Sequence, residues 1–296
     1  MKKSYFRYIA LFVGIIIFVD LIGGQILKTH FESISFGIYG KINNSLKSET
    51  EILVLGSSRA MHHYNPDIIS KATGFSCYNS GLGGYGLFYN YPVLNERVKK
   101  KLPKIVILDL SPNVIIDDKS YMKLNTLLPY YKNYTSFKEI LHLDSKFSNL
   151  ELVSNLYIYN SVIYDFLRSV FENDDNKNSG FVPLDSHMDS LNFTPVYLDN
   201  KHFDTNKITY LHKIINLCEE KNIKLIGVIS PTYRKFDINN KIINELRDIF
   251  ESKSLKFYDY SNFSKVYNKQ EYFKDQLHLN SKGAEIFSRE FAKKIN

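Results

Sequence analysis

Hydrophobic positions along the chain alternate between short, continuous apolar runs and longer amphipathic stretches. The continuous runs lie at residues 51–55, 104–110 and 224–229. Such runs are typical of parallel strands that are buried on both faces of a sheet. Helical periodicity occupies residues 88–102 and 208–221, just before the second and third runs. Strands that alternate with helices predict a three-layer α/β/α sandwich with a mostly parallel central sheet.

The middle of the chain has a different pattern. From about residue 119 to 199 it is helical, most clearly at 136–143 and 150–171, with many tyrosines and leucines. A polar, turn-rich segment at 173–180 follows the longer of these helices. We therefore expect an inserted helical cap within one domain that spans residues 50–296. The cap is either a lid over a site at the sheet edge or a surface decoration, and the pattern leaves both open.

The N-terminal segment predicts the compartment. Lys2, Lys3 and Arg7 precede the stretch Tyr8–Leu27, which is almost wholly apolar and long enough to cross a bilayer as one helix. Basic residues at its start place the N-terminus in the cytoplasm and the rest of the chain outside. We expect a single-pass signal anchor at residues 1–27 of a bacterial-type cell membrane, followed by a juxtamembrane connector at 28–49.

A cleaved signal peptide is the alternative for the same segment. The uninterrupted apolar part stops before Asp20, but no small-x-small cleavage site follows and residues 21–27 are apolar again. The two cysteines, Cys77 and Cys218, are too few to form a disulfide framework outside the cytoplasm. We expect both to be buried thiols.

Composition narrows the class of partner. The chain has 296 residues, of which 44% are hydrophobic, and its net charge is +7 with a pI of about 9.0. This charge suits a membrane surface or an anionic polymer. The one dense basic run, at 99–101, ends a predicted helix, where cations complement the helix dipole. We therefore expect no nucleic-acid partner.

Candidate catalytic chemistry is concentrated at two distant positions. Gly56, Ser57 and Ser58 follow the first apolar run, where a strand turns into a helix at the carboxyl edge of the sheet. Near the C-terminus, Asp275 and His278 lie on a loop before the last helix. A histidine can act as general base for a serine while an aspartate fixes its tautomer. In isolation, however, the serines could simply be N-cap residues.

A glycine-rich segment between two predicted strands offers a second interpretation. Gly81, Gly83 and Gly86 form the G-x-G-x-x-G pattern of dinucleotide-binding proteins, and Asp109 ends the next strand. Pro92 interrupts the helix that would hold the pyrophosphate, and nicotinamide cofactors are scarce outside the cytoplasm. We therefore expect no cofactor. The glycines could instead bring a backbone N–H close to a reacting oxygen.

Four further residues lie in or beside these segments. Asn113 follows the strand at 104–110 and could donate its side-chain amide to an oxyanion, or serve as a turn residue after Pro112. His62 and His63 follow Ser58 by about one helical turn. With no familiar metal-ligand spacing, we expect them on the helix surface or at the entrance to the site, and no metal. Arg59, directly after Ser58, could hold an anionic substrate, but we expect it on a solvated helix face.

Together, the segments around Ser58, Asn79–Gly84, Asn113 and Asp275–His278 resemble, in order, the four conserved blocks of the SGNH (GDSL-like) hydrolase family. The resemblance covers residue 50 to the end, except the cap. Ser57 replaces the usual aspartate of the first block, and Val114 replaces an aspartate that commonly follows the asparagine of the third. The Gly-Ser-Ser opening, the Ser-Pro turn and the single anchor are most similar to the membrane-anchored DltD/AlgJ-like acyltransferase branch.

The resemblance implies an SGNH/flavodoxin-like fold and a Ser-His-Asp triad. Ser58 would be the nucleophile, His278 the base and Asp275 its orienting carboxylate. The N–H groups of Ser58 and Gly84, with the Asn113 amide, would form the oxyanion hole. The implied activity is that of an extracytoplasmic serine esterase or O-acyltransferase acting on a glycan or envelope polymer, with a membrane-bound acyltransferase as partner. A non-catalytic accessory protein of an acylation system is the alternative.

Overall fold

The computed structural model describes residues 2–35, 37–111, 113–116, 119–143, 152–171, 179–188, 202–233, 240–267 and 269–295. These residues form two compact units. The first unit comprises the described parts of Met1–Asn43 and Tyr121–Asp175, and the second those of Asn44–Ser120 and Asn176–Asn296. Most of the polar segment predicted at 173–180 and the end of the predicted cap lie outside the described residues.

A five-stranded sheet forms the centre of the second unit. Its strands are β1 (Ile52–Leu55), β2 (Cys77–Asn79), β3 (Ile105–Asp109), β4 (Lys224–Ile229) and β5 (Lys256–Asp259). The strand order is β2-β1-β3-β4-β5, and every neighbouring pair is parallel. Each connection between neighbouring strands includes a helix, as parallel pairing requires. The predicted fold class is confirmed.

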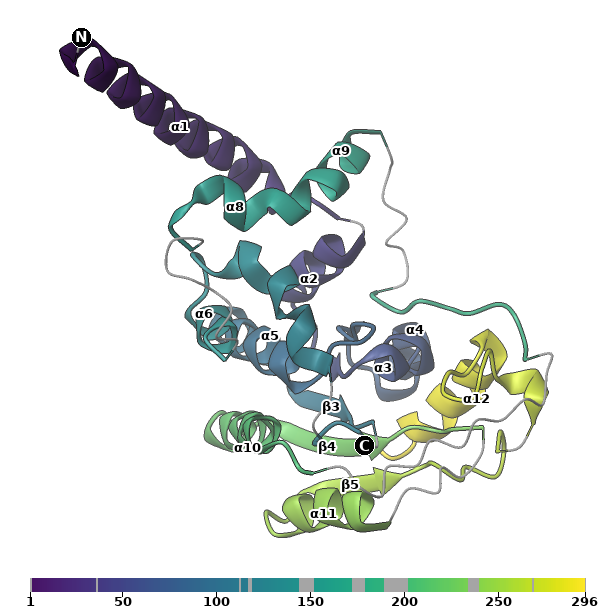
Figure 1. The fold of residues 1–296 in the computed structure, drawn as a ribbon. Helices are drawn as coiled ribbons and strands as arrows, with labels where there is room; N and C mark the ends of the chain where they lie inside the picture. The colour runs from purple at the N-terminus through teal and green to yellow at the C-terminus, as the bar shows by residue number, and fades with distance from the viewer. Residues whose placement is uncertain are drawn as a thin grey trace. The chain divides into compact units, whose positions relative to one another are not determined.

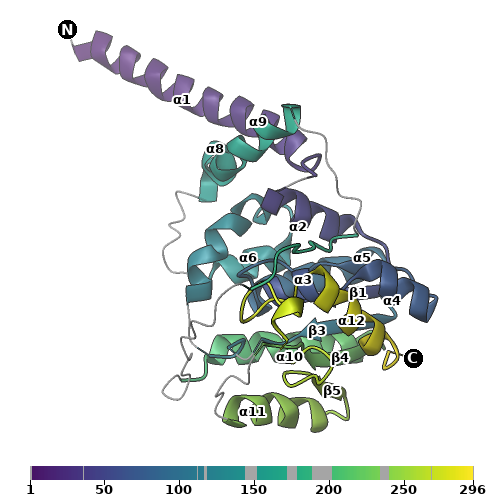
Figure 2. The same ribbon diagram turned by 90° about the vertical axis from the view of Figure 1, so that its right-hand side faces the viewer.

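Helices cover both faces of the sheet. Those of the second unit are α3 (Ser58–His63), α4 (Pro66–Thr73), α5 (Leu87–Lys100), α10 (Thr205–Glu220), α11 (Asn240–Glu251) and α12 (Ser281–Ala292). One strand face, which includes Val54 and Ile107, packs with Phe287 and Phe291 of α12. Helix α10 lies on the opposite face from α12 (Figure 1 and Figure 2). The central strands β1, β3 and β4 are buried on both faces, which explains their continuous apolar runs.

The pairing register aligns the carboxyl ends of the central strands. Leu55 of β1 pairs with Leu108 of β3, and Leu108 pairs with Gly227 of β4. The segments that follow these strands therefore begin at the same edge of the sheet. This edge carries the serines of the predicted first block.

Strand β5 and helix α11 of the second unit, like the short helix α4, were not predicted from the hydrophobic pattern. Strand β5, at the sheet edge, has exposed or half-buried side chains throughout, so its sequence lacks a continuous apolar run. Helix α11 places Leu246 and Phe250 in the core behind a strongly polar outer face. The expectation of two buried thiols is confirmed for Cys77 and Cys218.

The first unit is helical. Its elements are α1 (Lys2–Phe31), α2 (Gly37–Lys47), η1 (Lys119–Tyr130), α6 (Thr135–Leu141), α8 (Asn155–Tyr159), η2 (Asn160–Val162) and α9 (Ile163–Phe171), with the last residues of α2 and the first of η1 in the second unit. Phe31 packs its ring edge-on against Tyr39 and Tyr130. Asn43 donates to the Phe31 carbonyl at 2.7 Å and accepts from the Tyr130 hydroxyl at 2.9 Å. This aromatic cluster joins the chain before residue 44 to the segment predicted as the cap.

Helix α1 is continuous from Lys2 to Phe31. In the described part of the chain, its segment Tyr5–Phe31 is the one helix long and apolar enough to cross a membrane, by length and composition. Figure 1 shows α8 and α9 beside the C-terminal part of α1, while the N-terminal part projects beyond them.

Candidate active site

Ser58 begins helix α3 directly after a tight turn that follows β1. Gly56 forms this turn with a φ of +151°, and a Cβ atom there would come within 2.6 Å of the Ala60 Cβ. Glycine is therefore required by both conformation and space. Ser57 occupies the N-cap position, but its side chain makes no capping hydrogen bond. The turn thus presents Ser58 at the carboxyl edge of the sheet.

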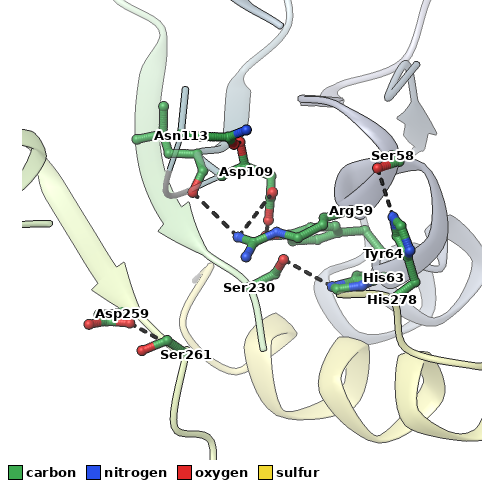
Figure 3. A network of polar contacts seen from close by, with 12 residues as sticks. Ser58, Arg59, His63, Tyr64, Asp109, Asn113, Ser230, Asp259, Ser261 and His278 are labelled. Atoms are coloured by element: carbon green, nitrogen blue, oxygen red, sulfur yellow. Dashed lines mark hydrogen bonds and ion pairs between the residues drawn. The ribbon is translucent and has the colours of Figure 1, made fainter. Parts of the chain in front are cut away.

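Ser58, His278 and Asp275 form a continuous hydrogen-bond relay. The Ser58 Oγ lies 2.8 Å from Nε2 of His278 (Figure 3). The other ring nitrogen, Nδ1, lies 2.9 Å and 3.0 Å from the two carboxylate oxygens of Asp275. Because a carboxylate only accepts hydrogen bonds, Nδ1 carries the proton and donates it to Asp275. Nε2 is then the acceptor for the serine hydroxyl, which is the tautomer that a general base requires.

The loop that carries the pair is held by its own backbone. Asp275 Oδ1 accepts the N–H groups of Leu277 at 2.8 Å and His278 at 3.0 Å. Partial burial alone would raise the pKa of Asp275, but the hydrogen bonds from His278 and from these two N–H groups outweigh it and lower that pKa. Asn280 caps the following helix by accepting the Gly283 N–H at 3.1 Å. Asp275 is therefore held as a carboxylate facing His278.

His63 holds the same loop through hydrogen bonds of its ring nitrogens. Its Nε2 accepts the backbone N–H of Leu279 at 2.9 Å, so its Nδ1 carries the proton and donates to the Ser230 hydroxyl at 2.9 Å. His63 is fully buried and lies on the helix that Ser58 begins. It therefore links the serine's helix, the end of β4 and the histidine's loop. The expectation that His63 lies on the helix surface is wrong, and its stabilising contacts were not found from the sequence.

His62 is buried too, at 9% exposure, although the sequence placed it at the surface or entrance. Its Nδ1 donates to the Val182 carbonyl at 2.7 Å, and its ring packs edge-on against His278, with 5.5 Å between centroids. Both His63 nitrogens are occupied by protein groups. Over the described ranges, no three His, Cys, Asp or Glu side chains gather in a way that could hold a metal ion.

The buried state of His63 predicts a specific acid sensitivity. Burial lowers the pKa of His63 well below 6.5, and the nearby Arg59 charge lowers it further. Below about pH 6.5 the unfolded chain binds a proton at this position and the folded chain does not. The free energy of unfolding therefore decreases as the pH is lowered. We expect protonation linked to His63 to lower the free energy of unfolding by up to about 1.4 kcal/mol for each unit by which the pH is lowered. Urea unfolding of the full chain in detergent at pH 7.5, 6.5 and 5.5 measures it.

His63→Gln is the matched control, because its amide oxygen can still accept the Leu279 N–H but does not titrate. The slope of unfolding free energy against pH should be smaller in this variant between pH 6.5 and 5.5. Equal slopes in the two proteins would contradict the assignment of a neutral, buried His63.

Arg59 is buried as well, at 3% exposure, so its expected place on a solvated face is wrong. Its Nη2 lies 3.5 Å from Oδ1 of Asp109 and donates to the Leu110 carbonyl at 3.4 Å. The Tyr64 hydroxyl donates to the other Asp109 oxygen at 2.8 Å. These groups lie beneath the sheet edge, beside His63 (Figure 3). Asp109 is thereby a structural carboxylate, which removes the acidic residue from the dinucleotide pattern.

The glycine-rich turn approaches the serine closely. A Cβ atom on Gly83 would lie 3.8 Å from the Ser58 Cβ, so this glycine is the neighbour of Ser58. Gly84 is the next residue and has a φ of +78°. A Cβ atom on Gly81 would collide with the backbone N of Met61. Close packing of this turn on α3 accounts for Gly81 and Gly83 without a dinucleotide, whereas a Cβ atom on Gly86 would meet nothing within 4 Å.

Asn113 is placed apart from the relay. Its side chain is exposed, and its Oδ1 accepts the Ser111 hydroxyl at 2.6 Å. In Figure 3 it lies on the Asp109 side of Arg59, with Ser58 on the other side. Pro112, between Ser111 and Asn113 in the predicted turn, lies outside the described residues. The structure therefore brings together Ser58, His278 and Asp275, with Gly83 beside Ser58 and Gly84 next to it in the chain, but leaves Asn113 outside this group.

Asn79, whose side chain was not assigned a role from the sequence, organises the helix of the serine. It is fully buried at the end of β2. Its amide nitrogen donates to the carbonyls of Ala60 at 2.7 Å and Tyr64 at 2.8 Å, and its oxygen accepts the Gly81 N–H at 2.9 Å. One side chain thus holds both α3 and the glycine turn.

Comparison with known proteins gives similarity of structure only. No family model matches the chain, and no curated protein matches it. A solved structure provisionally described as a platelet activating factor from Streptococcus pneumoniae is 13% identical, with 97% of this chain and 99% of that chain covered and a TM-score of 0.44. A GDSL-like lipase from Bacteroides thetaiotaomicron is 12% identical, with 83% and 88% covered and a TM-score of 0.39. A lipase/acylhydrolase from Enterococcus faecalis is 14% identical, with 83% and 95% covered and a TM-score of 0.40.

Proposed function

We propose that this chain is a membrane-anchored, extracytoplasmic serine esterase or O-acyltransferase that acts on an envelope or exported polysaccharide. The observation that carries the proposal is the relay from Ser58 through His278 to Asp275, with oxygen-to-nitrogen distances of 2.8 Å and 2.9 Å. Three residues from the two ends of the fold meet in the order and tautomer that acyl transfer needs. A polar surface cluster without a catalytic role would not require this order.

The first half of the reaction forms an acyl-enzyme. The Ser58 Oγ attacks the carbonyl carbon of an ester while Nε2 of His278 takes the hydroxyl proton. Asp275 stabilises the resulting imidazolium through the bond to Nδ1. The tetrahedral intermediate then collapses, the ester C–O bond breaks, and the alcohol leaves with the proton from His278.

Backbone N–H groups of Ser58 and Gly84 are the proposed donors to the oxyanion, and the position of Gly83 beside Ser58 makes its N–H a further candidate. Asn113 would join them only if its side chain moved toward Ser58, because its Oδ1 now accepts the Ser111 hydroxyl within its own turn. In the second half, His278 removes a proton from water or from a sugar hydroxyl, whose oxygen attacks the acyl carbon. The bond between that carbon and the Ser58 Oγ then breaks, and His278 returns the proton to Ser58. Water gives an esterase and a sugar gives a transferase.

An ester assay tests the proposal. The full chain in detergent should release p-nitrophenol from p-nitrophenyl acetate, and Ser58→Ala should reduce the rate by about 10⁴-fold or more. Ser57→Ala is the matched control, since this neighbouring serine makes no capping bond and should keep its activity. If a sugar is the acceptor, added oligosaccharide should accelerate the transfer of the acetyl group from the enzyme and therefore the release of p-nitrophenol.

Two other results would contradict the proposal. Hydrolysis that persists in Ser58→Ala at the wild-type rate would rule out Ser58 as the nucleophile. A folded chain with no activity in any variant would favour the non-catalytic accessory protein, which the position of Asn113 outside the relay also favours.

A further inference from the structure

Asp20 ties the membrane-anchor helix to a helix of the same unit. Its carboxylate accepts the Ser154 hydroxyl at 2.5 Å and the backbone N–H groups of Asn155 at 2.9 Å and Leu156 at 3.0 Å. These groups form the N-terminus of α8, where a carboxylate is stabilised by unsatisfied N–H groups and the helix dipole. A charge within an apolar helix is thus explained as a built contact rather than a defect of the span.

Small residues extend the contact along α1. A Cβ atom on Gly24 would collide with the Asn155 Cβ, and one on Gly23 would lie 2.9 Å from Leu156. Close approach of two helices requires such small residues. Helix α8 is therefore packed on α1 from Asp20 to Gly24, while the neighbouring α1 side chains Leu21, Ile22 and Ile26 are each about half exposed, at 54%, 49% and 51%.

This packing shortens the part of α1 that is bare of protein. The segment from Tyr5 to Val19 would span about 22 Å at about 1.5 Å per residue. The hydrocarbon core of a bilayer is about 30 Å thick. The turns beyond Asp20 must therefore complete the span, and they enter the bilayer boundary together with the helices packed on them.

Helix α9 carries an unpartnered apolar face at this boundary. Ile163, Tyr164 and Leu167 lie on one side of the helix and are 43%, 72% and 54% exposed. On the other side, Val162, just before the helix, is buried, and Phe166 packs edge-on against His30 of α1 with 5.3 Å between centroids. The helix, which lies beside the C-terminal part of α1 (Figure 1), thus contacts α1 by one face, and the side chains of its other face are exposed.

Cationic side chains border the same region. Lys28 in the last turns of α1 and Arg168 of α9 are both exposed. Apolar side chains beside cations and a tyrosine are typical of helices that lie in the headgroup region of a bilayer. A surface that binds the bilayer must lie next to the membrane span, whereas a surface that binds a protein partner need not. Helix α9 packs on α1 itself, which favours the bilayer.

We infer that the outer face of α9, with Leu21, Ile22 and Ile26 of α1, is a lipid-docking surface. It lies in the headgroup and upper acyl region of the leaflet on the globular side of the membrane, and its occupant is the bilayer that α1 crosses. The inference rests on the proposed membrane anchoring and goes beyond it. The first unit then contacts the membrane through both α1 and α9, so α1 does not act as a flexible tether.

The chain has no tryptophan, so single tryptophans can report on each position. Phe12→Trp on α1, Leu167→Trp on α9 and Leu102→Trp in the second unit replace side chains that are 64%, 54% and 50% exposed. Each full-length variant is reconstituted alone in phosphatidylcholine and phosphatidylglycerol nanodiscs. Emission is compared between plain lipids and lipids brominated either near the headgroup end or near the end of the acyl chain.

We expect Leu167→Trp to lose emission most with bromine near the headgroup end, and Phe12→Trp with deeper bromine. Leu102→Trp should be unchanged. If Phe12→Trp is quenched while Leu167→Trp matches Leu102→Trp, the docking surface is wrong and the anchor stands. If Phe12→Trp is not quenched, the anchoring fails, and quenching of Leu167→Trp alone would leave α9 as a surface-binding helix. Tyr164→Trp, on the same face, gives an independent reading should Leu167→Trp fold poorly.

Discussion

Asp275→Asn is expected to lower kcat/KM for ester hydrolysis by about 10⁴-fold while leaving the fold intact. The asparagine oxygen can still accept the N–H groups of Leu277 and His278, which now bond Asp275 Oδ1 at 2.8 Å and 3.0 Å. The loop therefore keeps its shape. The asparagine NH₂ group, however, faces Nδ1 of His278 and favours the tautomer with the proton on Nε2, which cannot take a proton from Ser58.

The matched control is Asp185→Asn. Asp185 is an exposed carboxylate that accepts the Ser281 hydroxyl at 2.8 Å at the start of α12 and does not contact the relay in the described residues. It should keep its activity within about threefold, in line with the small effect of a surface substitution. Equal activity of wild type and Asp275→Asn, at equal unfolding midpoints, would remove Asp275 from the mechanism.

Arg59→Met is expected to have the largest effect on stability, a loss of about 3–5 kcal/mol of unfolding free energy. The side chains of Arg59 and Asp109 are 4% and 0% exposed, and without the guanidinium the buried carboxylate keeps, among the described residues, only the Tyr64 hydroxyl as a partner. An uncompensated buried charge is far more costly than a missing surface ion pair. The intact pair itself contributes little, because Nε and Nη1 of Arg59 have no hydrogen-bond partner among the described residues.

Arg289→Met provides the comparison, since Arg289 pairs with Glu285 at 2.7 Å on the exposed face of α12. Its cost should be below about 1 kcal/mol. Urea unfolding of the full chain in detergent measures both variants, and the double variant Arg59→Met with Asp109→Leu should recover part of the loss. A similar midpoint for the two arginine variants would contradict the account of the buried pair.

The sheet could be predicted from sequence wherever burial on both faces leaves a continuous apolar run, as in β1, β3 and β4. Strand β5 could not, because an edge strand with exposed and half-buried side chains has no such signal. The residues of the relay were found from their positions after a strand and before a helix. Their hydrogen bonds join the two ends of the domain, which no local pattern encodes.

The buried polar residues of α3 show the limit most clearly. Arg59 and His63 were expected at the surface because of their chemistry, although Ala60, His63 and Tyr64 follow the spacing of a buried helical stripe. That spacing was the available signal for His63. Nothing comparable marks Arg59, whose burial depends on the distant Asp109. Asn113 is positioned by a side-chain bond within its own turn, which the sequence alone did not indicate.

Ser58 is proposed as an activated nucleophile, and the proposed mechanism depends on it. Incubating the full chain with a fluorophosphonate and measuring intact mass and peptide masses tests it most directly. We expect one adduct per folded chain, located on Ser58, with much slower labelling in Asp275→Asn and none in Ser58→Ala. A folded chain that remains unlabelled, or an adduct on another residue with Ser58 unmodified, would contradict it.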